Sequence, residues 1–221
     1  PCAPPTERRV APSMCAVQDC APRPDRTHGP QSPAWPGGVR GRISAGMSRR
    51  ILLIDGHPDS QRGHFVHALA DAYAAGAAET GQDVRRIEVA QLDFPLIRAA
   101  RDWSEGTPPP DIAAAQADLR WAEHIVLLYP LWLGDMPALL KAFLEQVARP
   151  DFLYSGRAGP RRAVLKGRSA HVVVTMGMPG FLYRYFYGAH SLKSLRRNLL
   201  NFVCVRPVPE TIVGGLGIEN D

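Results

Sequence analysis

Three short, continuously apolar runs constrain the fold of this chain more than any other feature: Ile51–Asp55, His124–Tyr129 and Ala170–Thr175. A run without polar alternation is typical of a strand that is covered on both faces. Two weaker segments, Val84–Val89 and Phe202–Val208, are predicted to be further strands, the second interrupted by a proline. Helical segments separate the strands, so the sequence predicts an α/β fold with a parallel sheet.

The predicted helices follow from apolar residues at helical spacing and from breakers at their ends. The first begins near Phe65 and ends before Gly81, which stands where a C-cap glycine is usual. The others are expected at Asp111–Trp121, after three prolines, at Met136–Val147 and at Gly188–Leu200.

Residues 1–46 differ from the rest of the chain. They contain nine prolines and lack apolar periodicity, so they cannot bury enough surface to offset the entropy of ordering. Six arginines against three acidic residues give this segment +3 of the net charge of +5. We therefore expect a disordered or non-native leader, followed by one domain at 47–221 that begins near Met47.

Charge and cysteine content limit what the domain can do. Residues 47–221 carry only about +2, too little for a nucleic-acid footprint. No apolar run is long enough to span a bilayer. Only Cys204 lies after the leader, within an apolar stretch, and is interpreted as a buried small apolar residue. A domain without a disulfide framework fits a cytoplasmic location.

Ligands of an open parallel sheet bind beyond the carboxyl ends of its strands, where three loops of unusual composition are expected. The first, 55–64, leads into a helix N-terminus, which favours an anion such as phosphate. The sequence has neither a dinucleotide-binding nor a P-loop glycine motif there. Side chains that could add donors are His57, Ser60, Arg62 and His64.

The second and third loops indicate a flat, largely apolar ligand. The second, 130–137, is apolar and carries Trp132, which suits a ring system better than a sugar or a metal. The third, 175–180, contains two glycines that let a ligand approach the backbone closely. A phosphate cradle beside two such loops is what a flavin needs.

The segment Tyr129–Val147, YPLWLGDMPALLKAFLEQV, resembles the flavodoxin-like NAD(P)H:quinone oxidoreductases, a family that includes potassium-efflux regulatory oxidoreductases and drug-activity modulators. The resemblance covers about Arg50 to Val213. It implies a doubly wound parallel five-stranded sheet of order 2-1-3-4-5, with a last helix expected to be missing beyond Asp221. It also implies FAD or FMN, NAD(P)H as hydride donor, a quinone-like acceptor and a homodimer.

The resemblance further implies roles for residues in all three loops. His57 would contact the flavin phosphate, and Tyr183 and His190 would lie at the hydride-transfer site. The residues expected along the flavin ring are Pro130, Leu131, Trp132 and Leu133, with Thr175, Met176, Gly177 and Met178 at its polar edge. Arg62-Gly-His64 replaces the family's usual Ser-Phe-Asn pattern, and one extra residue separates Tyr183 from His190.

Two alternatives belong to other functional classes. Asp55-Gly-His-Pro-Asp59 is similar to the opening motif of zinc-dependent deacetylases, but Ser60 and Gln61 replace the residues that would supply the base and the next ligand. A flavodoxin-type carrier or a transporter-regulating subunit would share the same fold and loops. Rapid turnover of a bound flavin by NAD(P)H and a quinone distinguishes the enzyme from both.

Overall fold

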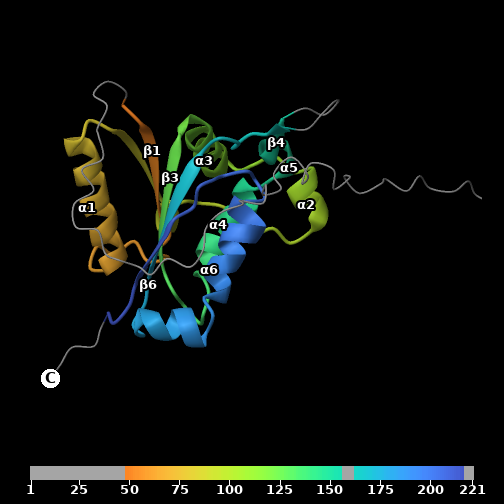
Figure 1. Cartoon of the computed structure of the whole chain (residues 1–221). Coiled ribbons are helices and arrows are strands. Elements are labelled where there is room, and N and C mark those ends of the chain that lie inside the picture. Colours follow the sequence, from red (N-terminus) through yellow and green to blue (C-terminus); the bar gives the residue numbers. More distant parts are fainter. Residues whose placement is uncertain (1–47, 156–161, 217–221) are drawn as a thin grey trace, which may run out of the picture.

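The computed structural model describes residues 48–155 and 162–216, and the predicted leader at 1–46 and the end near Asp221 lie outside them. One parallel five-stranded sheet runs through the described part in the order β2-β1-β3-β6-β7 (Figure 1). This confirms the expected order 2-1-3-4-5. The strands are β1 (Arg50–Asp55), β2 (Asp83–Glu88), β3 (His124–Pro130), β6 (Ser169–Thr175) and β7 (Glu210–Val213).

Helices cover both faces of the sheet, α1 on one side and α3, α4 and α6 on the other (Figure 1). The other segments are short, and the hairpin β4–β5 was not predicted. The helices are α1 (Phe65–Glu79), α2 (Ala100–Ser104), α3 (Pro110–Trp121), α4 (Ala138–Val147), α5 (Pro150–Leu153) and α6 (His190–Ser194). The short segments are η2 (Val89–Gln91), η3 (Leu182–Phe186), η4 (Leu195–Leu200), β4 (Tyr154–Ser155) and β5 (Arg162–Ala163).

The continuous apolar runs reflect burial on both faces. In β3, Val126 and Leu128 belong to the core beneath α1, whereas Ile125, Leu127 and Tyr129 belong to the larger core beneath α3 and α4. Successive side chains of a strand point to opposite faces. Because each face is covered by helices, every position of the run is apolar.

The predicted position of the fifth strand is wrong. The strand was expected at Phe202–Val208, but β7 occupies Glu210–Val213. Pro207 and Pro209 have no N–H to donate to a ladder, although their carbonyl oxygens accept hydrogen bonds from β6. Val203 and Val205 are buried against the core beneath α4 and α6. Their apolar character therefore reflects packing of an irregular segment.

Two further expectations differ from the structure. The last predicted helix begins at His190, because Gly188 and Ala189 both have positive φ. Cys204 is half-buried and disulfide-bonded, so its interpretation as a buried small apolar residue is wrong. Among the described helices, none is both long and apolar enough to cross a membrane.

Close backbone contacts hold the loops against the sheet. A Cβ at Gly56 would lie 2.7 Å from the Leu140 side chain and 3.0 Å from the carbonyl oxygen of Leu128. A Cβ at Gly214 would lie 2.3 Å from the backbone nitrogen of Gly180. Glycine at these positions lets the chain after β1 pass over β3, and the chain after β7 pass beside the third loop.

Candidate functional site

The three loops meet at the carboxyl-terminal edge of the sheet. The backbone N–H of Leu131, in the second loop, donates to the carbonyl oxygen of Thr175 at 2.7 Å. The ring of Trp132 stands edge-on to the ring of His57, with 6.0 Å between their centres. The order of β1, β3 and β6 in the sheet therefore brings together the loops that the sequence singled out.

His57 is a buried donor at the start of the first loop. Its Nδ1 lies 3.1 Å from both the backbone nitrogen and the carbonyl oxygen of Asp59, and its ring stacks on His64 with centres 4.0 Å apart. Burial lowers the pKa of His57, an effect that a hydrogen bond to the carbonyl oxygen of Asp59 partly offsets. In the neutral tautomer whose Nδ1 accepts from the Asp59 N–H, the proton lies on Nε2, which can then donate to a ligand.

The beginning of α1 is open to an anion. His64 is the N-cap residue but makes no side-chain capping bond, and the first turn holds no acidic residue. Within the described residues, the backbone N–H groups of Arg62, Gly63 and Phe65 have no acceptor. Uncapped N–H groups at the positive end of a 15-residue helix fit a phosphate.

The other predicted side chains of the first loop are arranged differently. Arg62 reaches Glu88 at 2.9 Å and lies 3.7 Å from Asp71, so it is already paired with carboxylates. Ser60 is exposed, and His64 bonds to the carboxylate of Asp59 at 3.0 Å. Backbone donors and His57 therefore offer a phosphate more free hydrogen bonds than Arg62 does.

The second loop is a tight turn with one exposed aromatic face. Trp132 and Asp135 exchange backbone hydrogen bonds of 2.8 and 2.9 Å across the turn. Leu133 and Gly134 have positive φ, which places Leu133 at the solvent-exposed tip. Pro130 and Leu131 are half-buried, whereas Trp132 is half-exposed beside His57. Trp132 is thus the largest side chain of this loop available to a flat ligand.

The third loop is bound to the chain that follows β7. The N–H of Met176 donates to Val213, and its carbonyl oxygen accepts from Leu216. Thr175 and Met176 are buried, Met178 is half-buried, and Gly177 is exposed. Gly177 therefore offers the most accessible backbone of the four residues expected at the polar edge of the ring.

Tyr183 and His190 lie on one segment but in different environments. Tyr183 is only 2% exposed, and its hydroxyl forms a 2.7 Å hydrogen bond with the buried Ser191. His190 is exposed at the start of α6. Sequence reasoning missed Ser191, because no motif marks a partner eight residues away across an irregular turn.

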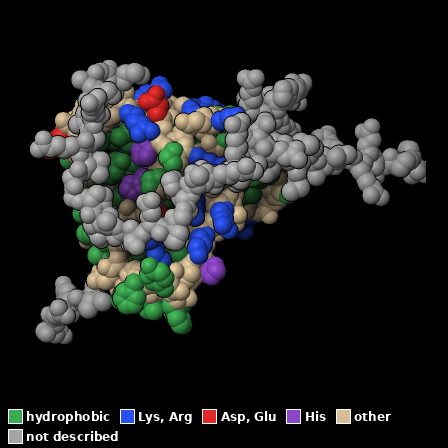
Figure 2. Space-filling model, in the orientation of Figure 1, with side chains coloured by type: hydrophobic (Ala, Val, Ile, Leu, Met, Phe, Trp, Pro, Cys, Tyr) green, Lys and Arg blue, Asp and Glu red, His purple; other side chains and the backbone are tan. Residues whose placement is uncertain are grey.

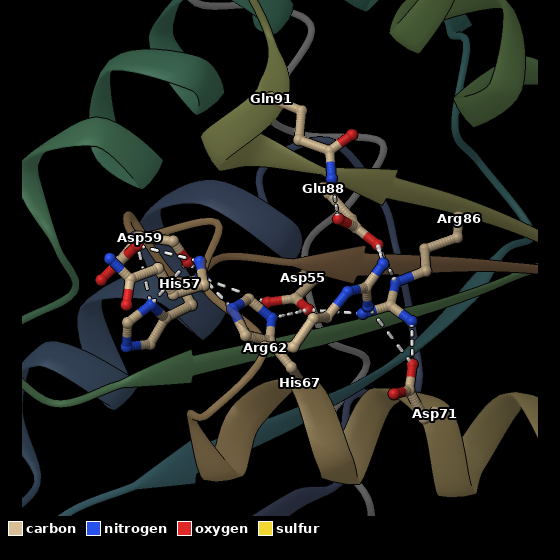
Figure 3. A network of polar contacts seen from close by, with 10 residues as sticks. Asp55, His57, Asp59, Arg62, His67, Asp71, Arg86, Glu88 and Gln91 are labelled. Atoms are coloured by element: carbon tan, nitrogen blue, oxygen red, sulfur yellow. Dashed lines mark hydrogen bonds and ion pairs between the residues drawn. The ribbon is translucent and has the colours of Figure 1, made fainter.

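A buried ionic network lies behind the first loop and was also missed (Figure 3). Oδ2 of Asp55 accepts from Nδ1 of His67 at 2.6 Å and from Arg86 at 2.8 Å. Arg86 also pairs with Asp71 and lies 3.1 Å from Glu88. The only sequence signal was Asp55 itself, a charged residue that ends an apolar strand.

The histidines of this loop are engaged with each other and with the chain. Both ring nitrogens of His67 have partners, and Nδ1 of His57 is occupied. Within 48–155 and 162–216, no group of three or more His, Cys, Asp or Glu side chains has the arrangement of a metal site. The deacetylase alternative therefore gains no support from the first loop.

Comparison with known proteins agrees with this architecture. An uncharacterized NAD(P)H oxidoreductase of Haemophilus influenzae is 28% identical over 174 residues, which cover 77% of this chain and 86% of that protein. The NAD(P)H:quinone oxidoreductase from Methanothermobacter marburgensis superimposes with a TM-score of 0.62 at 22% identity, covering 79% of this chain and 91% of that one. The FMN-dependent NADH-azoreductase from Bacillus anthracis, in complex with FMN, has a TM-score of 0.59 at 13% identity, covering 78% and 90%.

The two solved structures share the fold with this chain. Membership of a family is shown by a family model. That model, described as flavodoxin-like fold, matches residues 49–221. It spans all five strands of the sheet and the three loops at their carboxyl ends. The resemblance carried by Tyr129–Val147 is confirmed at this level, and the chain belongs to the flavodoxin-like fold family.

Proposed function

We propose that this chain is a flavin-dependent NAD(P)H dehydrogenase that reduces quinone-like acceptors. The observation that carries the proposal is the open start of α1 beside His57 and Trp132, where free N–H groups, a ring donor and an aromatic face converge. The Haemophilus relative bears the name of an uncharacterized NAD(P)H oxidoreductase, and the Bacillus azoreductase with the same fold is in complex with FMN. These similarities support a flavin and a nicotinamide donor here.

The first loop would hold the phosphate of the flavin. The free N–H groups of Arg62, Gly63 and Phe65 would donate to its oxygens, and Nε2 of His57 would add a further donor. Ser60, Arg62 and His64 would contribute from the rim of the loop. The Arg62 side chain would contribute least, because it is paired with Glu88. FMN and FAD both carry a phosphate at this position, so the first loop accepts either.

The second and third loops would hold the ring system. Trp132 offers an aromatic face, with Pro130 and Leu131 behind it and Leu133 at the mouth of the loop. The exposed backbone of Gly177 would reach the polar edge of the ring, within a loop that Thr175, Met176 and Met178 fix to the sheet. A rigid polar edge lets the protein orient the ring and tune its electronics.

The bound flavin would supply the chemistry, accepting a hydride from NAD(P)H and passing it to the acceptor in a ping-pong cycle. Tyr183 and His190 would stabilise the charge that develops at the transfer site. The hydrogen bond from Tyr183 to Ser191 fixes the phenol ring, and His190 is open to an approaching acceptor. A cytoplasmic location stays a prediction from the sequence.

The direct test is the visible absorbance spectrum of the purified protein, with FMN or FAD added where it purifies without colour. We expect a flavin spectrum that NADH or NADPH bleaches and a quinone restores. Trp132→Ala should weaken flavin binding about tenfold through the lost ring contact. Trp103→Ala, which removes a partly exposed tryptophan in α2, should not. Flavin binding without turnover would favour the carrier or regulatory alternative, and the absence of binding would refute the proposal.

An exposed aromatic patch supports the further proposal of a homodimer. Phe181, Tyr185 and Phe186 are 68%, 81% and 77% exposed, and Tyr187 is half-exposed beside them. Apolar side chains form the green cluster at the lower edge of Figure 2, over η3. Contiguous apolar patches on soluble proteins commonly mark interaction sites, and this one adjoins Tyr183 and His190.

Sedimentation velocity tests this assembly. We expect the wild-type protein to sediment as a dimer and the double variant Tyr185→Ser, Phe186→Ser to sediment as a monomer, because the patch loses most of its apolar area. Leu96→Ser, which removes an exposed leucine elsewhere, should leave the dimer intact. A monomeric wild-type protein, or a dimer that the double variant retains, would contradict the proposed interface.

A further inference from the structure

The ring of His67 lies between two oxygen atoms. His67 is in the first turn of α1 and is 2% exposed. Its Nδ1 lies 2.6 Å from Oδ2 of Asp55, and its Nε2 lies 2.9 Å from the backbone oxygen of Asp59. A carbonyl oxygen can only accept, so Nε2 must carry a proton. The charge of the ring therefore depends on which atom holds the proton between Nδ1 and Asp55.

The surroundings of Asp55 place that proton on His67. Oδ2 of Asp55 also accepts from the Arg86 guanidinium at 2.8 Å, and Oδ1 accepts from the backbone N–H of His57 at 3.2 Å. Two donors and a neighbouring cation favour the ionised carboxylate. An ionised Asp55 can only accept, so Nδ1 of His67 must donate. Both ring nitrogens then carry protons, and His67 is an imidazolium.

Through Asp59, His67 controls the geometry of the first loop. The carbonyl of Asp59 accepts from His67, while Nδ1 of His57 lies 3.1 Å from both the backbone nitrogen and the carbonyl oxygen of Asp59. The carboxylate of Asp59 accepts from the N–H of Gln61 at 2.9 Å and contacts His64 at 3.0 Å. Asp59 is thus the centre of the loop, and His67 fixes it from the helix. The orientation of the His57 ring depends on this arrangement.

The charged groups that face His67 come from every element around it. Asp55 attracts the imidazolium from β1, Glu88 attracts it from β2, and Arg86 opposes them from β2. Burial lowers the pKa of His67, but its hydrogen bonds to Asp55 and Asp59 outweigh burial and leave the pKa above its usual value. The remaining titratable or charged groups nearby are Asp71 on α1 and His57, Asp59, Arg62 and His64 in the first loop.

We propose that His67 acts in its imidazolium form as a positioning residue: it holds Asp59, and through Asp59 His57, in the arrangement that receives a flavin phosphate. The proposal rests on the proposed flavin site. When His67 loses its proton, one of its two hydrogen bonds is lost, together with a positive charge close to the start of α1. Affinity for a phosphate-bearing flavin therefore falls as the pH rises through the titration of His67.

The charge of His67 is testable without any ligand. In the nitrogen-15 NMR spectrum of the histidine-labelled protein, His67 should show two protonated ring nitrogens at about pH 6 and titrate above the usual histidine value of 6.5. The spectrum of His67→Gln identifies its signals. A His67 ring that titrates at or below the usual value would overturn the proposal, whatever the ligand does.

The effect on binding is measured by fluorescence titration with FMN over the pH range in which the NMR spectra show that His67 loses its proton. We expect wild-type affinity to fall about tenfold as His67 titrates, which corresponds to one charge-assisted hydrogen bond. His67→Gln should bind FMN about tenfold more weakly at the lowest pH, with no further dependence on pH. His171→Gln, which removes a histidine bonded to Thr211 on β7, should match the wild-type profile.

Riboflavin, which lacks the phosphate, separates positioning from general loosening of the site. Its affinity should be the same for the wild-type protein and for His67→Gln. If FMN affinity does not change while His67 titrates, or if riboflavin shows the same loss, the positioning role is wrong. If FMN binds at no pH, the proposed function fails along with the binding step, and the NMR result still decides the charge of His67.

Discussion

Replacing Asp55 with Asn is expected to lower the free energy of unfolding by about 3 kcal/mol, the cost of removing one partner from a buried ion pair. Asp55 is 1% exposed, and its carboxylate accepts hydrogen bonds from His67, Arg86 and the N–H of His57. The amide has nearly the same shape, so no cavity forms. The loss comes from two cationic groups that keep their desolvation cost without the carboxylate between them.

The loss of unfolding free energy in Asp55→Asn should depend on pH, in the direction set by the titration of His67. The pKa of His67 is raised above its usual value, so its contribution to stability is complete below about pH 6.5 and is lost as pH rises through the folded-state pKa. The difference between wild type and Asp55→Asn should therefore be larger near pH 6 than near pH 9. Urea unfolding at both values measures it. A difference that grows with pH would contradict the assignment of charge to His67.

A surface carboxylate provides the matched control. Asp118 pairs with Arg85 at 2.7 Å, and both side chains are partly exposed. Asp118→Asn should change the free energy of unfolding by less than about 1 kcal/mol. A similar loss of unfolding free energy in both variants would mean that the buried Asp55 network stabilises the fold no more than an exposed ion pair does.

The fold could be predicted largely because burial leaves a direct trace in the sequence. Residues 51–54 and 125–129 are apolar at every position, which is typical of a strand covered on both faces. Phe202–Val208 shows the limit of this argument. Val203 and Val205 are buried without belonging to a strand, because Pro207 and Pro209 cannot donate to the ladder. Apolar character reports burial, whereas strand pairing depends on backbone donors.

The candidate site could be predicted at the level of loops but not of contacts. Loops that follow parallel strands meet at one edge, so the approach of Trp132 to His57 follows from strand order. The links from Asp55 to His67 and Arg86 span 12 and 31 residues. No local pattern encodes them, because they depend on the register of β2 against β1 and on the angle of α1.

Tyr183→Phe is expected to lower kcat/KM for the acceptor about 100-fold, the usual effect of removing one donor that acts on developing charge. The structure adds a second consequence, because the hydroxyl is also the partner of the buried Ser191. Losing that bond should lower the free energy of unfolding by about 1 kcal/mol. His190→Ala, at an exposed position, should lower turnover without this loss of stability.

Two control variants separate the catalytic and structural roles of the Tyr183 hydroxyl. Ser191→Ala removes the same hydrogen bond but leaves the phenol, so it should reproduce the loss of stability and only a small part of the loss in turnover. Tyr185→Phe removes an exposed hydroxyl from the same segment and should change neither. Steady-state kinetics with NADH or NADPH and a soluble quinone, combined with thermal unfolding, measure both effects. If Ser191→Ala lost as much turnover as Tyr183→Phe, the phenol would act by holding the segment between η3 and α6, and only His190 would retain a role in transfer. Unchanged turnover in both Tyr183→Phe and His190→Ala would remove these two residues from the reaction and leave the flavin-binding loops as the whole of the proposed site.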